Sequence, residues 1–152
     1  MAEDEIKKAK RKAMQILTRM DRSEYDLSNS LRRSKFSEEA VLAAVEYVKS
    51  YGYIDDARYA RMYIRTHQHQ RGRIRLQYEL GNKGVSADLV AQAYEELELA
   101  EEKEVVRSLV KKKWNKPEKP NEKELARIVG YLARQGFKNQ DIWCILHEEN
   151  LT

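Results

Sequence analysis

Three arginines between residues 58 and 65 recur at spacings of three and four. On a helix of about 100° per residue, Arg58, Arg61 and Arg65 fall within a stripe roughly 60° wide. Guanidinium groups bind phosphates and carboxylates through paired hydrogen bonds. Like charges this close on a helix repel one another unless a partner neutralises them. A solvated surface is the alternative, but the spacing favours an anionic partner.

The arginine stripe belongs to a longer basic segment that ends at Lys83. It contains seven basic side chains and a single acid, Glu79. The seven are Arg58, Arg61, Arg65, Arg71, Arg73, Arg75 and Lys83. Residues 84–106 carry seven acids against one base, and residues 107–123 carry seven bases against two acids. Alternating bands favour a partner that shows both signs of charge, such as a protein–nucleic acid filament, over bare DNA.

No set of residues predicts catalysis, a metal site or a cofactor site. His67 and His69 are two positions apart, so on a helix they point about 200° away from each other. Asp55 and Asp56 are adjacent, which suits helix capping better than paired acid–base chemistry. A phosphate-binding glycine loop and a nucleophile elbow are also missing from the sequence. We therefore expect a protein that is not an enzyme and that needs no metal or cofactor.

The elements that position these side chains repeat three times. Leu31, Leu80 and Leu132 are the anchors, at spacings of 49 and 52 residues. Each anchor has an apolar residue four positions before it and others five and ten positions after it, which predicts two helices joined by a tight turn. A further helix precedes each pair, at residues 6–20, 56–69 and roughly 103–114.

We therefore predict an all-α protein made of three tandem three-helix repeats, at residues 1–52, 53–100 and 101–152. Short helical triplets bury little surface alone, so neighbours must share apolar faces. An elongated, curved row follows from this, with a compact nine-helix globule as the competing architecture. The segment 116–121 holds both prolines and predicts a loop inside the third repeat.

Turn and cap residues accompany the predicted helices. Gly84 and Gly136 suit left-handed C-terminal caps, and Lys35 stands at the same place in the first repeat. The predicted N-caps are Ser37, Ser86, Asn139 and, for the arginine-bearing helix, Asp55. Asp56 then lies in the first turn of that helix, where a negative charge is favoured.

The composition sets the broad class of protein. The chain has 152 residues, of which 36% are charged, and its net charge is +4. Its amino end has no apolar segment like that of a signal peptide, and no run of eighteen apolar residues occurs. We expect a soluble, cytoplasmic protein without a membrane contact.

Two stretches within residues 20–95 carry a specific combination of motifs. They are "RSEYDLSNSLRRSKFSEEAVLAAVEYVKSYGYIDDARYARMYIR" and "GRIRLQYELGNKGV". The matching positions are Ser23, Glu24, Tyr25, Gly52, Tyr53, Asp55, Asp56, Arg58, Tyr59, Ala60, Gly72, Arg73, Ile74, Arg75, Glu79, Leu80, Lys83 and Gly84. Together these stretches resemble the RecX regulatory proteins of bacteria, whose pattern marks Asp55, Asp56, Arg58 and Tyr59 as characteristic. The resemblance is weaker beyond residue 95, in the third repeat.

The resemblance implies tandem three-helix repeats and a non-catalytic regulator of the RecA recombinase. Such a protein binds along the groove of the RecA–DNA filament and inhibits ATP hydrolysis and strand exchange, in homologous recombination, DNA repair and the SOS response. We expect a monomer whose seven basic residues contact the filament. The structural positions are Gly52, Tyr53, Asp55, Asp56, Tyr59, Leu80 and Gly84. A helical module that binds DNA directly, without the recombinase, is the alternative.

Overall fold

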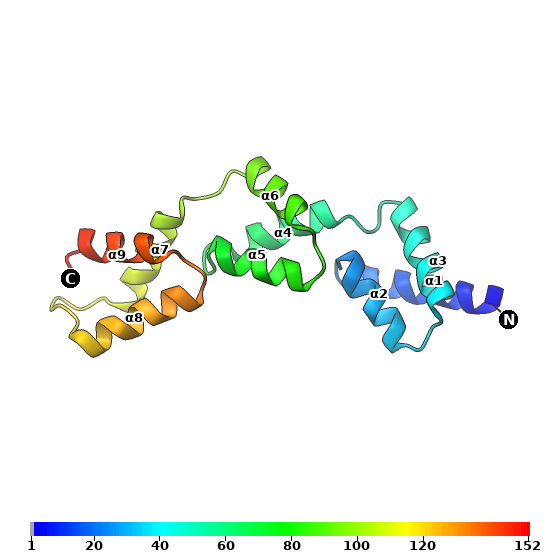
Figure 1. Ribbon diagram of the computed structural model, residues 1–152, viewed down its shortest axis with the longest axis horizontal. Coiled ribbons are helices and arrows are strands. Elements are labelled where there is room, and N and C mark those ends of the chain that lie inside the picture. The colour runs from blue at the N-terminus through cyan, green and yellow to red at the C-terminus, as the bar shows by residue number, and fades with distance from the viewer. Residues whose placement is uncertain (1) are drawn as a thin grey trace. The chain divides into compact units, whose positions relative to one another are not determined.

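The computed structural model describes residues 2–152, and in this part of the chain the regular secondary structure is all α-helical (Figure 1). It contains nine α-helices and no β-strand. Their bounds are α1 Ala2–Arg19, α2 Glu24–Arg33, α3 Glu38–Ser50, α4 Asp56–His67, α5 Arg73–Asn82, α6 Ala87–Glu96, α7 Glu102–Lys113, α8 Glu122–Arg134 and α9 Asn139–Glu148. The all-α prediction is confirmed.

The helices match the predicted pattern of one leading helix followed by a pair. α1, α4 and α7 are the leading helices, and α2–α3, α5–α6 and α8–α9 are the pairs. The proline-bearing segment 116–121 is the loop between α7 and α8, as expected of residues that cannot continue a helix. The leading helix α1 begins at Ala2, earlier than predicted, because its acidic first turn is itself a good helix start.

The turn inside each pair has the same backbone geometry. An N–H group donates to the carbonyl of the anchor leucine five residues earlier, at 3.4, 3.0 and 3.3 Å: Phe36 to Leu31, Val85 to Leu80, and Phe137 to Leu132. The residue before each donor has a positive φ: Lys35 at 67°, Gly84 at 78° and Gly136 at 92°. These are Schellman caps, which explain why an apolar residue recurs five positions after each anchor.

Most of the predicted N-caps are confirmed. The side chains of Ser37, Ser86 and Asp55 accept hydrogen bonds from backbone N–H groups in the first turns of α3, α6 and α4. The prediction for Asn139 is wrong, because this residue is the first of helix α9 and Lys138 occupies the cap position without a side-chain bond. The start of α9 is instead stabilised by Asp141, whose negative charge lies in the first turn, near the positive end of the helix dipole.

The chain divides into two compact units. The first comprises Met1–Met62 and Leu80–Glu96, and the second comprises Tyr63–Glu79 and Leu97–Thr152. Helices α4 and α5 each contribute residues to both units. The repeat boundaries after residues 52 and 100 divide the chain by sequence pattern, whereas these units divide it by spatial contact. The boundaries therefore stay predictions.

The main core of the first unit is built by α1, α2 and α3. Small residues on α1 let α3 approach closely, and leucines of α2 close the core. Its buried members are Ala9, Ala13, Leu27, Leu31, Ala40, Val41, Ala44, Val45, Val48 and Ile54. Burying these apolar side chains is the dominant stabilising term for the triplet.

The main core of the second unit is built by α7, α8 and α9. Its buried members are Val105, Val106, Leu109, Val110, Ile128, Leu132, Phe137, Ile142, Ile145 and Leu146. Trp114 and Tyr131 pack at its edge while keeping part of their surface exposed. None of the helices within residues 2–152 has the length and apolar character needed to span a membrane.

Each unit also contains a contact between the start of one helix pair and the turn of the next. In the first unit, Ser23 before α2 meets Lys83 in the α5–α6 turn, and its Oγ donates to the Lys83 carbonyl at 2.6 Å. In the second unit, Gly72 before α5 meets Gln135 in the α8–α9 turn, and its N–H donates to the Gln135 carbonyl at 2.7 Å. We call these contacts the first and second junctions.

Candidate functional site

The helix α4 carries the predicted arginine stripe. Asp55 starts it by accepting a hydrogen bond from the Arg58 N–H at 3.1 Å. Its inward face is apolar, with Ala60 and Ile64 fully buried and Tyr59 only 9% exposed. The three arginines therefore lie on the remaining, polar side of the helix.

Arg58 has partners inside the protein. Its guanidinium donates to the carbonyls of Gly52 and Tyr53, at 3.1 and 3.4 Å, and lies 3.7 Å from the Asp21 carboxylate. These bonds hold the turn between α3 and α4, where Gly52 has a φ of 73°. The structure thus gives Arg58 a stabilising role in the loop, and its contact with a partner stays a prediction.

Arg61 and Arg65 differ in their surroundings. The guanidinium of Arg61 lies 3.3 Å from the carboxylate of Glu96 at the end of α6. Arg65 is exposed and forms no ion pair with any of residues 2–152. Because exposed ion pairs contribute little, Glu96 competes only weakly with an external anion for Arg61.

Glu79 organises the basic residues around the start of α5. Its carboxylate accepts hydrogen bonds from Arg71 at 3.0 Å, from the Tyr63 hydroxyl at 3.1 Å and from Arg75 at 3.2 Å. All of these groups are part-buried, so their mutual attraction is stronger than it would be in water. We call Tyr63, Arg71, Arg75 and Glu79 the Glu79 cluster.

The cluster changes the acidity of its members. Burial alone would raise the pKa of Glu79, but the hydrogen bonds from Arg75 and Tyr63 and the charge of Arg71 lower it overall. Burial and the charge of Glu79 raise the pKa of the Tyr63 hydroxyl. Burial and the charge of Arg71 lower the pKa of the adjacent His67, which therefore favours its neutral form.

The remaining predicted contacts, Arg73 and Lys83, lie at the ends of α5. The Arg73 N–H donates to the carboxylate of Glu102 at 2.6 Å, so an acid of the following band caps this helix. The Lys83 ammonium lies 3.6 Å from the Asp26 carboxylate of α2. Arg73 thus contributes its backbone N–H group to the cap of α5, and Lys83 contributes its ammonium group to an ion pair with α2.

Sequence reasoning missed the acids that accept hydrogen bonds from, or form ion pairs with, residues of the basic segment. Asp21, Asp26, Glu96 and Glu102 all come from outside the basic segment, so spacing along the chain gave no sign of them. Glu79 was visible, since it follows Arg75 by one helical turn. The alternating bands are therefore used in part to hold the protein together.

Comparisons with known proteins match these helices to one family. The model for the second three-helix domain of RecX matches residues 55–93, and the model for the third matches residues 100–146. A regulatory protein RecX of Vibrio vulnificus is 33% identical over 90% of this chain and 90% of its own length. The chain belongs to the RecX family.

Other RecX proteins agree with this assignment. The regulatory protein RecX of Caldanaerobacter subterraneus subsp. tengcongensis is 34% identical over 91% of this chain and 68% of its own length. The one of Clostridium perfringens is 29% identical, and the chain spans only 65% of it. The crystal structure of RecX from Lactobacillus salivarius has the same fold, with a TM-score of 0.81 at 22% identity over 98% of this chain and 99% of the other.

The RecX resemblance predicted from the sequence is therefore confirmed, and the matched domains coincide with α4–α6 and α7–α9. The structural part of the family pattern has a clear physical basis. Gly52 adopts a positive φ, and Leu80 is fully buried beneath the α5–α6 turn. The Asp56 carboxylate accepts the Glu24 N–H at 2.9 Å, which caps α2, and burial raises its pKa.

Gly84 and Tyr53 complete that structural set of RecX positions. Gly84 has a positive φ, and a Cβ on it would also overlap the Tyr25 side chain. Tyr53 is 44% exposed and stacks on Tyr51 at 5.7 Å between ring centroids. Gly84 is therefore required by the packing, whereas Tyr53 contributes an exposed ring.

Proposed function

We propose that this chain is a non-catalytic regulator that binds the RecA recombinase on DNA. It lies in the groove of the RecA–DNA filament and inhibits ATP hydrolysis and strand exchange. The observation that carries this proposal is membership of the RecX family, whose members are named regulatory proteins. Arg65 supports it, because an exposed arginine without an internal counter-charge is available to an anionic partner.

The bands of opposite charge fit a filament that displays both protein and phosphate groups. Arg61 and Arg65 suit phosphates, whereas exposed acids such as Glu95 and Glu98 suit basic protein side chains. Arg58, Arg71 and Arg75 have internal partners, so we expect them to contribute less to binding. This ranking refines the predicted set of seven contacts.

The decisive experiment measures ATP hydrolysis by RecA on single-stranded DNA, with and without this protein. We expect inhibition by the unaltered chain and weaker inhibition by the double variant Arg61→Glu/Arg65→Glu. The matched control is Lys8→Glu/Arg11→Glu, which makes the same charge change on two exposed residues of α1. Unchanged ATP hydrolysis in the presence of the unaltered protein would contradict the proposal.

A second candidate function is direct DNA binding without the recombinase. The seven bases between residues 58 and 83 favour it, since cations that neutralise phosphates provide most of nonspecific DNA affinity. It predicts equal DNA binding with and without RecA. It also predicts that Arg61→Glu/Arg65→Glu removes about two phosphate contacts. The slope of log affinity against log salt concentration should then become shallower by roughly 1.8 on duplex DNA.

A further inference from the structure

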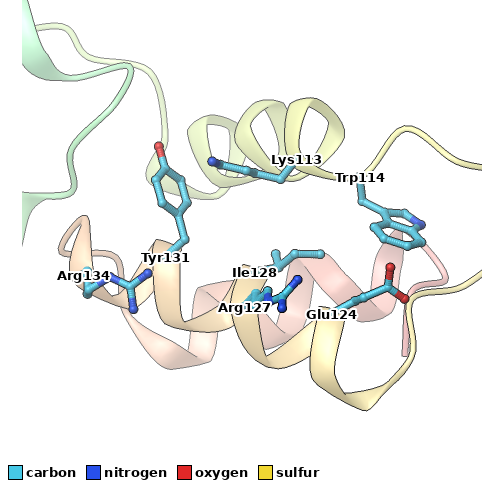
Figure 2. Close-up of a pocket in the computed structure, with 7 residues that line it drawn as sticks. All are labelled: Lys113, Trp114, Glu124, Arg127, Ile128, Tyr131 and Arg134. Carbon is cyan, nitrogen blue, oxygen red and sulfur yellow. The ribbon is translucent and has the colours of Figure 1, made fainter.

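A groove in the second unit lies between the end of α7 and one face of α8. Its volume is about 420 Å³. Figure 2 shows side chains from both walls facing the same hollow: Lys113, Trp114, Glu124, Arg127, Ile128, Tyr131 and Arg134. The α8 members recur at spacings of three and four, which places them on one side of that helix.

Three cations converge on this groove without a carboxylate partner. Lys113, Arg127 and Arg134 are exposed and form no ion pair within residues 2–152. The one acid in the lining, Glu124, is part of the α8 capping box, where its Oε1 accepts the Asn121 N–H at 3.1 Å. The groove therefore has a surplus of positive charge.

Two other cations of α7, Arg107 and Lys111, have carboxylate partners. The Arg107 guanidinium lies 2.6 Å from Glu148 and 3.0 Å from Glu149, and the Lys111 ammonium lies 3.7 Å from Glu149. Both cations are neutralised by acids at the end of α9. Lys113, Arg127 and Arg134 have no such partner in the described part of the chain and stay available to an anionic ligand.

A glycine in the middle of α8 supports the position of Arg134. Glycine at such a site costs roughly 0.5–1 kcal/mol relative to alanine. A Cβ on Gly130 would lie 3.1 Å from Arg134 Nη1, tighter than most such contacts, so the guanidinium would have to shift slightly. Gly130 thus lets the guanidinium lie back against the helix beside the groove.

Two aromatic rings line the groove together with the cations. Lys113 Nζ lies 4.0 Å from the centre of the Tyr131 ring, and Lys116 Nζ lies 5.0 Å from that of Trp114. Trp114 Nε1 donates to the Glu118 carbonyl at 2.8 Å, which fixes the indole at the end of α7. Both rings are only partly buried, so each keeps surface for a ligand.

We propose that this groove binds single-stranded DNA. Arg127, Arg134 and Lys113 contact phosphates, and an unpaired base stacks against Trp114 or Tyr131. Cationic grooves lined with aromatic rings bind single strands in this way. A duplex hides the faces of its bases from such rings, and an acidic peptide offers carboxylates but no ring to stack.

This site goes beyond the RecA regulator proposed above, because it acts on free DNA, and it differs from the second candidate function because it lies outside the basic segment 58–83. Its test therefore omits the recombinase. The variant Trp143→Phe leaves Trp114 as the one tryptophan, since the chain has two and Trp143 lies exposed on α9. We expect a twelve-nucleotide oligo(dT) to quench Trp114 fluorescence in a saturable titration.

Charge variants, made in the Trp143→Phe background, locate the phosphate contacts. We expect Arg127→Ala/Arg134→Ala to weaken oligo(dT) binding about tenfold and to make its salt dependence shallower by roughly 1.4. The control Lys8→Ala/Arg11→Ala removes the same charge from α1 and should leave the affinity within about twofold of the parent. Equal weakening by both variants would refute the assignment.

Ring variants in the same background test the stacking. We expect Tyr131→Leu to weaken binding roughly tenfold, whereas Tyr131→Phe keeps the ring and the affinity. Equally tight binding of a duplex hairpin or a poly-glutamate peptide would overturn the proposal and indicate a general anion site. Absence of oligo(dT) binding, with RecA inhibition intact, would overturn this site and leave the proposed RecA regulator standing.

Discussion

The two junctions use equivalent positions but different chemistry. Ser23 and Gly72 are 49 residues apart, and their acceptors in the following turns are the carbonyls of Lys83 and Gln135, 52 residues apart. These are the repeat spacings predicted from the leucine anchors. The first junction uses a side-chain hydroxyl as the donor, whereas the second uses a backbone N–H group.

A second pair of equivalent positions differs in charge. Asp26 in the first junction lies 3.6 Å from the Lys83 ammonium. Arg75 in the second donates to the Gln135 amide oxygen at 2.5 Å and also pairs with Glu79. The acid Asp26 of the first junction thus corresponds to the base Arg75 in the second. Its partner Lys83 corresponds to the neutral amide Gln135.

The difference shows which features of the repeat are fixed by geometry. Both turns end on a glycine with positive φ that has no room for a Cβ: Gly84 against Tyr25, and Gly136 against Arg75. Backbone shape is therefore kept between the junctions, while the side-chain pairs are interchangeable. The second junction packs more closely, because Gly72 itself has no room for a Cβ against the Gly136 carbonyl.

The largest expected effect is that of Gly72→Ala at the second junction. The added methyl group overlaps backbone atoms that cannot rotate away, so we expect a loss of about 2–3 kcal/mol in the free energy of unfolding. Urea unfolding followed by tryptophan fluorescence measures it, since both tryptophans lie in the second unit.

Gly81→Ala is the matched control for this change. Gly81 lies in α5 with open space around its Cβ position, so alanine there should stabilise the protein by about 0.5–1 kcal/mol. If both alanine variants unfold at the same urea concentration, the close packing of Gly72 against the α8–α9 turn does not contribute to stability.

Glu79→Gln should have the next largest effect. It leaves Arg71 and Arg75 part-buried without their counter-charge, and we expect a loss of about 1–2 kcal/mol after allowing for solvent screening. The same fluorescence-detected unfolding experiment at pH 7 measures it.

The pH dependence provides an independent check on Glu79. Its pKa is lowered in the folded protein, so its stabilisation is complete above the unfolded carboxyl pKa of about 4.3 and is lost as pH falls through the folded value. The glutamine variant should therefore lose less stability than the parent between about pH 5 and pH 3. Parallel curves for the two proteins would argue against the Glu79 cluster.

Ser23→Ala tests the first junction and should cost about 1–2 kcal/mol. The hydroxyl is fully buried, donates to Lys83 and accepts the Asp26 N–H at 3.2 Å. Ser86→Ala, which removes a cap bond to Leu89 without a junction contact, is the comparison variant. Circular dichroism during urea unfolding measures both, and identical losses would mean that the junction bond contributes nothing.

Asp26→Asn should have the smallest effect, at most about 0.5 kcal/mol. The ion pair with Lys83 is 3.6 Å long and its side chains are 26% and 34% exposed, so water and salt screen it. The difference from the parent should disappear in 1 M salt. A loss that persists at high salt would show that Asp26 acts through packing, not charge.

The positions of the helices were predictable because their signals are local. Apolar spacing located the helix pairs, and Ser37, Ser86 and Asp55 marked helix starts through bonds that span only three residues. Asn139 failed as a cap because the helix began at that residue, and a one-residue shift cannot be read from a pattern of 3.6 residues per turn.

The partners of the basic residues were not predictable. Arg58 bonds to carbonyls of the preceding loop, and Arg61 pairs with an acid 35 residues away, so neither contact follows from spacing on α4. The α7–α8 groove was missed for the same reason. Its cations come from two helices, α7 and α8, whose approach is set by packing of the core around Ile128 and Leu132.

The sequence by itself determined the helices, the threefold repetition and the family, because periodic apolar burial and capping act over a few residues. Only the tertiary structure decided which charges are neutralised inside the protein and which stay available, as Arg71 and Arg65 illustrate. The physical reason is that an ion pair depends on distance in space, and helices distant in sequence supply the counter-charge.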